Sequence, residues 1–451
     1  MRIQSCLIRS TVISGLALGA CLFWSASASA EVTLIEKDGW EFFADGRVNA
    51  FLSVGFGDDF PPPSPNTDGG SEHAVIGDQA LGAAGQNTQQ DDASNKYFAM
   101  RVRNGFVGTV LGFGVKRHLT ADTTIKSYIA MWHHAESNNR VRNEFNRIDV
   151  RQGYMEFDGP WGNFLAGRNI GLFGRTSTDI NFLYGHNYGL GYPCGDGQGP
   201  TCGHIGNGVM FPGFAPGLVY TTPSLGGLKL AAGLYDPVRL LGAWPRAPIA
   251  RPEGQLTFEQ KLGNTGMFKL GVEGTIQPVG RLKGDGAGGL IDDTDTVWGL
   301  AGGGRLELGP VRFGAAAFRG KGLGQYYALQ NSPAVFNGST WEIRTFTGVY
   351  AQGALVLGKT QLSLGAGRVT VDQLEADKID IAISNVKYHT GISAAVYYEV
   401  YKSLALGVDY FRFQTDWWGA PRSDANGQIP GYLPAEKQVI SYINVGGTFH
   451  W

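Results

Sequence analysis

The amino-acid sequence predicts an all-β fold, a transmembrane antiparallel β-barrel of about 16 strands. Apolar and polar residues alternate with a period of two in many short runs, which indicates strands with one apolar face. Glycine supplies 68 of the 451 residues and interrupts these runs every few positions, so helices are disfavoured. The connections are either short turns or long polar segments, which is the layout of a barrel whose long loops emerge at one end.

The overall composition excludes several other classes. The 37 Lys and Arg residues nearly balance 39 Asp and Glu residues, so a nucleic-acid partner is not expected. Apolar residues make up 43% of the chain, which is enough to bury a core and argues against disorder. Beyond residue 30 the sequence holds no apolar run of ~18 residues, so helical membrane spans are not expected.

Residues 1–30 have the features of a secretory signal peptide. Arg2 and Arg9 precede the apolar stretch Thr11–Phe23, and small residues end at Ala30, where we expect cleavage. The alternative is a lipoprotein signal ending at Cys21, which the bulky residues that follow disfavour. The mature barrel domain is then expected to span residues 31–451.

The mature chain retains two cysteines, Cys194 and Cys202. In an exported protein such a pair is expected to form a local disulfide. Two free thiols in a loop remain the alternative.

The strands are placed by alternation, which is clearest between Gly391 and Val400. There Ile392, Val396 and Tyr398 share one face, while smaller or polar residues share the other. Strands are expected near 42–54, 99–118, 123–133, 146–157, 162–169, 217–222, 226–236, 254–262, 266–276, 296–308, 311–319, 343–357, 360–371, 389–400, 403–414 and 438–451.

The long segments between strands are rich in Pro, Gly, Asn and Asp. They are Gly55–Lys96, Asn169–Pro216, Asp236–Pro252, Gln277–Thr296, Gly320–Glu342 and Asp416–Glu436. A soluble β-sandwich or a propeller is the alternative architecture. The regular apolar face on so many strands disfavours a sandwich, and a propeller would show a repeat of ~40–50 residues.

The C-terminal residues carry the sharpest single signature. Ile443, Val445, Phe449 and Trp451 alternate with polar or small residues, and the chain stops on the aromatic. This resembles the last strand of outer-membrane barrel proteins. The resemblance implies that Phe449 and Trp451 belong to a signal used by the outer-membrane barrel assembly machinery.

Two further stretches resemble the Gram-negative general porins. They are Arg151–Phe157 followed by Gly159–Arg168, and Asp45–Ala50 near the start of the mature chain. The resemblance implies a homotrimer in outer-membrane lipid whose third loop folds into the lumen. It also implies passive diffusion of small hydrophilic solutes and ions without a cofactor. The chain departs from the family in that its third loop holds only Asp179 and Asp196 as acids.

The candidate pore-lining residues follow from strand phase and from the third loop. Arg47, Arg151 and Arg168 are expected to form a basic wall, with Arg175 and Asp179 on the loop facing it. Such a wall predicts a weak preference for anions. The alternative interpretation is that these charges only solvate a wet lumen.

Enzymatic activity is not expected. The histidines, among them His133, His186 and His204, show no spacing typical of a metal site or a catalytic base, and no G-x-S-x-G motif is present. A solute-specific channel or a surface-binding barrel remains the alternative function, because fold alone does not separate these from a general porin.

Overall fold

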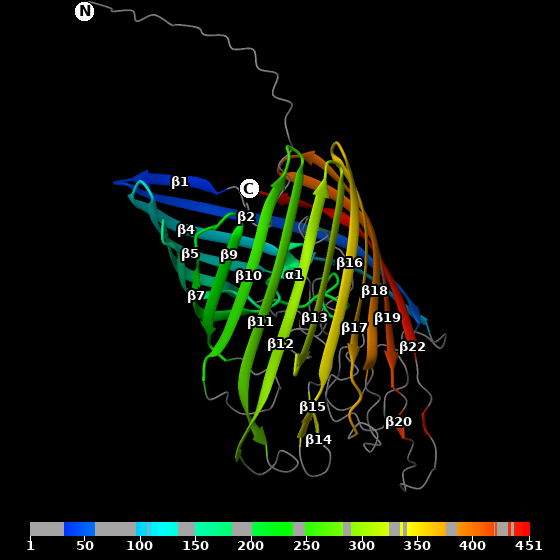
Figure 1. Cartoon of the computed structure of the whole chain (residues 1–451). Helices are drawn as coiled ribbons and strands as arrows, with labels where there is room; N and C mark the ends of the chain where they lie inside the picture. Colours follow the sequence, from blue (N-terminus) through cyan, green and yellow to red (C-terminus); the bar gives the residue numbers. More distant parts are fainter. Residues whose placement is uncertain are drawn as a thin grey trace, which may run out of the picture.

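Figure 1 shows the computed structural model of the chain. It describes residues 31–58, 96–105, 108–133, 149–182, 201–237, 249–282, 290–323, 334–336, 341–375, 386–418, 420–421, 432–433 and 437–451. The expected signal peptide, Cys194 and Asp196 lie outside these residues.

The described elements are almost all strands. They are β1 (Val32–Lys37), β2 (Trp40–Asp58), β3 (Lys96–Arg103), β4 (Thr109–Thr120), β5 (Thr123–His133), β6 (Asp149–Gly159), β7 (Gly162–Ile170), α1 (Arg175–Asp179), β8 (Phe214–Thr221), β9 (Leu228–Tyr235), β10 (Arg251–Leu262), β11 (Gly266–Leu282), β12 (Leu290–Leu308), β13 (Val311–Lys321), β14 (Ala334–Phe336), β15 (Trp341–Ile343), β16 (Thr345–Leu357), β17 (Thr360–Val371), β18 (Val386–Tyr401), β19 (Leu404–Trp417), β20 (Ala420–Pro421), β21 (Tyr432–Leu433) and β22 (Lys437–His450). Among the described residues, no helix is long and apolar enough to cross a membrane.

The wall is a closed antiparallel barrel of 16 strands, as the sequence predicts. It closes where β2, near the start of the mature chain, pairs with β22 at its end. β3 and β4 lie end to end along β2, so together they form one barrel strand. β1 is added at one end of the barrel, where it pairs with the first residues of β2.

The structure differs from the expected strands at two places. The strands predicted from the sequence do not include β1, because an alternation over only six residues is too short to be recognised as a strand. The expected strand at 99–118 is broken in two by Asn49 of β2. The Asn49 side-chain oxygen accepts hydrogen bonds from Asn104 Nδ2 at 3.2 Å and from the backbone N–H of Gly105 at 2.9 Å. These bonds take the place of ladder hydrogen bonds at the break.

Alternate residues of each strand face opposite sides of the wall. In β22, Tyr442 and Asn444 are fully buried toward the interior, whereas Ile443 and Val445 are exposed on the outer face. The outer face therefore carries the apolar residues and the inner face the polar ones, the arrangement expected for a barrel in lipid.

The two ends of the barrel differ in their connections. Short turns, such as Gly309–Pro310 and Lys402–Ser403, lie at the end that also holds the C-terminus (Figure 1). Long connections leave the opposite end, and the third of them joins β7 to β8 and contains α1.

Candidate functional site

Two wall carboxylates bind the first described part of the third connection, residues 171–182. Glu253 of β10 accepts hydrogen bonds from the backbone N–H groups of Leu172 at 2.8 Å and Phe173 at 2.9 Å. Glu273 of β11 accepts from Gly174 N–H at 2.7 Å and Thr176 N–H at 2.9 Å. The first N–H groups of a helix have no partner within it, so Glu273 satisfies the start of α1 with charge-assisted bonds, and Glu253 does the same for the two residues before its N-cap, Gly174.

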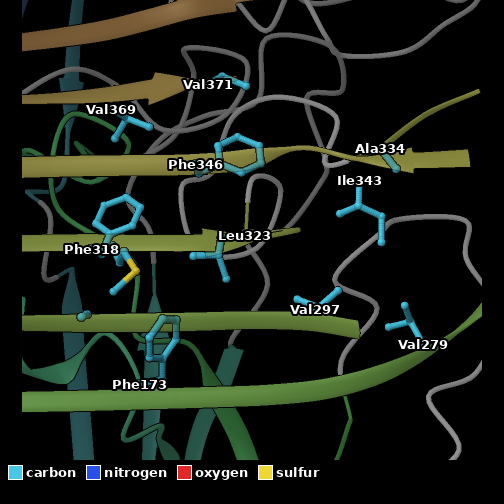
Figure 2. Packing of buried hydrophobic residues seen from close by; sticks show 12 residues of the cluster. Phe173, Val279, Val297, Phe318, Leu323, Ala334, Ile343, Phe346, Val369 and Val371 are labelled. Atoms are coloured by element: carbon cyan, nitrogen blue, oxygen red, sulfur yellow. The ribbon is translucent and has the colours of Figure 1, made fainter. Parts of the chain in front are cut away.

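Apolar contacts fix the same segment from its other side. Phe173 and Met210 of the loop belong to a buried cluster with wall residues that include Val297, Phe318 and Phe346 (Figure 2). Glycine occupies inward positions of the wall strands where the loop packs closely against them. A side chain at Gly299 would collide with the Phe173 ring, so this inward position has no space for a Cβ.

The second described part of the loop, residues 201–210, also packs on β16, β18 and β19, which follow β13 around the barrel. His204 is fully buried, and its Nε2 lies 2.8 Å from Ser393 Oγ of β18. Its ring centroid lies 4.7 Å from that of Tyr350 and 4.9 Å from that of Phe411. Burial lowers the pKa of His204 to about 3, so the imidazole is neutral at pH 7. The described parts of the loop thus contact the wall from β10 to β19.

Two of the expected wall arginines meet at one aromatic side chain. The guanidinium carbon of Arg47 in β2 lies 5.9 Å from the ring centroid of Trp132 in β5, and that of Arg151 in β6 lies 4.8 Å from the same ring. Phe214 packs edge-on against Trp132 at 5.6 Å. Asp149 accepts a hydrogen bond from Arg151 Nε at 2.7 Å. Cation–π contacts hold a guanidinium by its face and leave the N–H groups at its edge to bind anions.

The two expected loop residues are placed differently from one another. Arg175 donates from Nε to the carbonyl of Gly171 at 3.0 Å and from Nη2 to that of Ile170 at 2.6 Å. Arg175 is thus bound to the backbone at the end of β7. Asp179 instead lies 3.6 Å from Lys269 Nζ of β11, a strand that α1 contacts.

The expectation that Arg168 faces the lumen is wrong. In β7 the inward residue is Leu165, which packs against the buried Leu172 cluster. Arg168 lies an odd number of positions away, is exposed, and pairs with Gly153. Two residues along, Ala166 pairs with Met155, which is exposed on the outer face. The strand was too short and too rich in small residues for its phase to be assigned from sequence.

The remaining candidates concern structure and assembly. Cys202 is buried and disulfide-bonded, whereas Cys194 lies outside the described residues, so their pairing stays a prediction. Phe449 is exposed on the outer face. Trp451 exchanges two backbone hydrogen bonds with Gly46, at 3.0 and 3.2 Å.

Sequence reasoning missed Glu253, Glu273 and His204 as residues that position the loop. The signal available was glycine on inward positions, since Gly271 and Gly299 have no room for a side chain beside the loop. Among the described residues, no group of three or more His, Cys, Asp or Glu side chains could hold a metal ion.

A closed barrel with an apolar outside, a polar inside and an inserted loop defines a membrane channel. A family model described as Gram-negative porin matches residues 16–416. The chain therefore belongs to the Gram-negative porin family. It forms an outer-membrane channel for passive diffusion of solutes, and it is not an enzyme.

Solved structures share this fold at low sequence identity. The outer membrane channel DcaP of Acinetobacter baumannii is 14% identical with a TM-score of 0.61, over 93% of this chain and 99% of that one. An anion-selective porin from Comamonas acidovorans is 11% identical with a TM-score of 0.54, over 91% and 100%. OmpF of Salmonella typhi, in complex with daunomycin, is 13% identical with a TM-score of 0.50, over 92% and 99%. No curated protein matches the sequence.

Proposed function

We propose that this porin is a general diffusion pore that weakly prefers anions. The observation that carries the proposal is the convergence of Arg47 and Arg151 on Trp132. Asp149 is the carboxylate bonded to Arg151.

The acid expected to oppose this wall is largely neutralised. Asp179 is paired with Lys269, so the loop offers little negative charge to the arginines. The mature chain is slightly acidic overall, but a narrow lumen with low-dielectric walls focuses the field of its own charges. Charges on the outer surface are screened within ~8 Å at physiological salt. The local excess of arginine therefore sets the selectivity.

Reversal potentials in planar bilayers under a KCl gradient test this proposal. The wild-type channel should favour chloride, Arg151→Gln should lower that preference, and Arg151→Glu should favour potassium. Arg168→Gln is the matched control, because it removes the same charge from the outer face and should leave the potential unchanged. A wild-type channel that strongly prefers potassium, or no shift in Arg151→Glu, contradicts the proposal.

A linear rise of conductance with salt separates a general pore from a solute-specific channel. A diffusion pore without a binding step shows this linearity, whereas a channel with a binding site for the ion saturates. Saturation below about 1 M KCl would favour the solute-specific alternative.

We also propose that the chain is cleaved after Ala30, so that the mature protein begins at Glu31. The carboxylate of Glu31 lies 2.7 Å from Lys116 Nζ and 3.0 Å from Lys126 Nζ, which supports a mature end anchored on the inner wall. The intact mass of protein from outer membranes tests the cleavage site. Unreduced peptide mapping of the same sample tests the Cys194–Cys202 bond, which two alkylatable thiols would exclude.

The mature chain is proposed to act as a homotrimer, assembled with Phe449 and Trp451 as its recognition signal. Arg168 supports this arrangement. A charge on the lipid-facing side of a barrel costs up to about 2–4 kcal/mol near the midplane, and a subunit contact over β7 would remove Arg168 from lipid. Electrophoresis of unheated samples should show a trimer for the wild type. If Arg168 bonds to the neighbouring subunit, the Arg168→Leu trimer should dissociate more readily.

A further inference from the structure

The inner wall carries a second group of cations at the short-turn end of the barrel. Lys116 of β4 and Lys126 of β5 are paired across these two strands. Lys116 lies six residues along β4 from Val110, the partner of Arg47, and six residues of strand span roughly 20 Å. The lysines are therefore separate from the arginines around Trp132, although they lie on the same wall.

Both lysine side chains face the interior, where an aromatic ring positions them. The Lys116 ammonium lies 5.2 Å from the ring centroid of Phe43, and the Lys126 ammonium lies 5.1 Å from the same centroid. Phe43 is only 1% exposed and belongs to the buried cluster of Tyr128 and Trp132. Because the face of an aromatic ring attracts a cation, Phe43 stabilises both ammonium groups at this point of the wall.

A single carboxylate bridges the two ammonium groups. Glu31 Oε2 lies 2.7 Å from Lys116 Nζ, and Glu31 Oε1 lies 3.0 Å from Lys126 Nζ. Like charges directly opposite on neighbouring strands repel each other, so a carboxylate that bonds to both lysines offsets their repulsion. Glu41 lies 3.2 Å from Lys116 and also accepts a hydrogen bond from the Thr33 hydroxyl at 2.7 Å. The two lysines thus present one ammonium group to each oxygen of a carboxylate.

Solvent reaches this group, and Glu31 is attached to the barrel by a short strand. The side chains of Glu31, Lys116 and Lys126 are 22–30% exposed. Glu31 directly precedes β1, whose six residues are all exposed and which pairs with the first residues of β2 (Figure 1). Ion pairs that water reaches are weak, so a dissolved carboxylate can compete with Glu31 for the lysines.

We propose that Lys116 and Lys126 form a carboxylate-binding site at the short-turn mouth of the channel, and that Glu31 is its tethered occupant. A carboxylate solute that moves along the basic wall displaces Glu31, and its two oxygens take the places of Oε1 and Oε2. The tether therefore lowers the affinity of this mouth for anions. The inference rests on the proposed function for the passage of anions along this wall.

Block of the channel by citrate, a soluble carboxylate, tests the site. Single-channel current is measured in planar bilayers with equal KCl on both sides, while citrate is added to one side at a time. Glu31→Gln removes the charge of the occupant, and Lys116→Gln/Lys126→Gln in that background removes the site. Glu36→Gln is the matched control, because it removes the same charge from an exposed position of β1. Heat-dependent gel mobility confirms that each variant folds.

The citrate concentration that halves the current should fall at least fivefold in Glu31→Gln, and for citrate added to one side of the bilayer only. The triple variant should lose this gain, and Glu36→Gln should match the wild type. An unchanged block in Glu31→Gln, an equal gain in Glu36→Gln, or a gain that persists in the triple variant overturns the proposal.

Lysine labelling gives a second measurement, which does not depend on ion flow. Reductive methylation of Lys116 and Lys126, followed by peptide mass spectrometry, should be at least threefold faster in Glu31→Gln than in the wild type. The exposed Lys261 is the internal reference. Citrate should slow the labelling of both lysines in Glu31→Gln, and faster labelling without this protection overturns the carboxylate site. A wild-type channel that prefers potassium, with protection by citrate intact, would contradict only the proposed anion preference.

Discussion

Glu273 of the barrel wall holds Thr176 of the inserted loop at both of its donor groups. One carboxylate oxygen accepts a hydrogen bond from the Thr176 N–H at 2.9 Å and another from its hydroxyl at 2.7 Å. Gln255 Nε2 donates to the same oxygen at 3.0 Å. The polar inner face therefore also positions the loop. Its carboxylates accept the hydrogen bonds that the loop N–H and O–H groups would otherwise donate to water.

Replacement of Glu273 should loosen the loop without unfolding the barrel. Charge-assisted hydrogen bonds contribute about 1.5–3 kcal/mol each, so we expect Glu273→Ala to lower the free energy of loop docking by about 2–4 kcal/mol. Hydrogen exchange at Gly174 and Thr176 should accelerate, and single-channel current should become noisier. Glu259→Ala is the matched control, since Glu259 is exposed on the lumen side of β10. Equal effects of the two changes would exclude the proposed anchor.

The assignment of wall faces is tested by placing lysine on each side of β10. Leu256 is 43% exposed on the outer face, whereas Glu259 faces the lumen. Lysine on the lipid side costs about 2–4 kcal/mol near the bilayer midplane, so Leu256→Lys should lower the free energy of unfolding in liposomes by that amount. Glu259→Lys should change it by less than about 1 kcal/mol, because the lumen is wet. Similar losses from both variants would reverse or invalidate the assigned register.

Strand positions were predictable because one periodicity controls them. A barrel strand must alternate apolar and polar faces, so runs such as Ile392–Val400 and Leu404–Tyr410 are readable without any partner. The break between β3 and β4 was not readable, because it depends on Asn49 of another strand. β1 is likewise set by pairing with β2 and not by its own pattern.

The site was predictable only in part, because the sequence shows the periodicity within a strand but not its contacts with other parts of the chain. Arg47 faces the interior, as the phase of β2 indicates. Arg151 also faces the interior, but only because the register between β5 and β6 shifts beside it, between Ala130 and Met131. Arg168 lies in a short strand where Gly167 has a φ of 128°, and its phase could not be fixed. The loop anchors depend on contacts between residues about 80 to 190 positions apart in the chain. Period and spacing carry no information about such contacts.

Gly46 should be required where the chain end closes the barrel. A Cβ at Gly46 would lie 2.5 Å from Cζ2 of Trp451 and 2.8 Å from the carbonyl oxygen of Val110. Overpacking of this kind costs about 1–3 kcal/mol, so Gly46→Ala should lower the free energy of unfolding by that amount in protein refolded in vitro. Gly153→Ala should be neutral or slightly stabilising, because a Cβ there meets nothing within 4 Å.

A second variant isolates the contact with Trp451. If the indole causes the loss, Gly46→Ala should cost less in a Trp451→Leu background than in the wild type. An identical cost in the two backgrounds would assign the effect to Val110 alone.

His204 makes the docking of residues 201–210 sensitive to acid. Burial lowers its pKa to about 3 in the folded protein, whereas an undocked loop would have the ordinary value of about 6.5. Above pH 6.5 neither state binds a proton, so docking is unaffected by pH through this residue. Below pH 6.5 the undocked state is protonated and the docked state is not, so the free energy of docking falls by about 1.4 kcal/mol per pH unit until about pH 3.

This loss should be measurable at the two amides that bond to the His204 carbonyl. The N–H groups of Asn207 and Val209 donate to it at 2.8 and 3.1 Å. After correction for intrinsic rates, their protection from hydrogen exchange should fall between pH 6.5 and 4. In His204→Gln the pH dependence should vanish, even if docking is weaker at every pH, because glutamine does not titrate. The control variant His118→Gln replaces an exposed histidine of β4 and should retain the pH dependence of protection from hydrogen exchange. A wild-type protection factor that stays constant down to pH 4 would mean that His204 leaves its apolar site without cost, contrary to its packing against Tyr350 and Phe411.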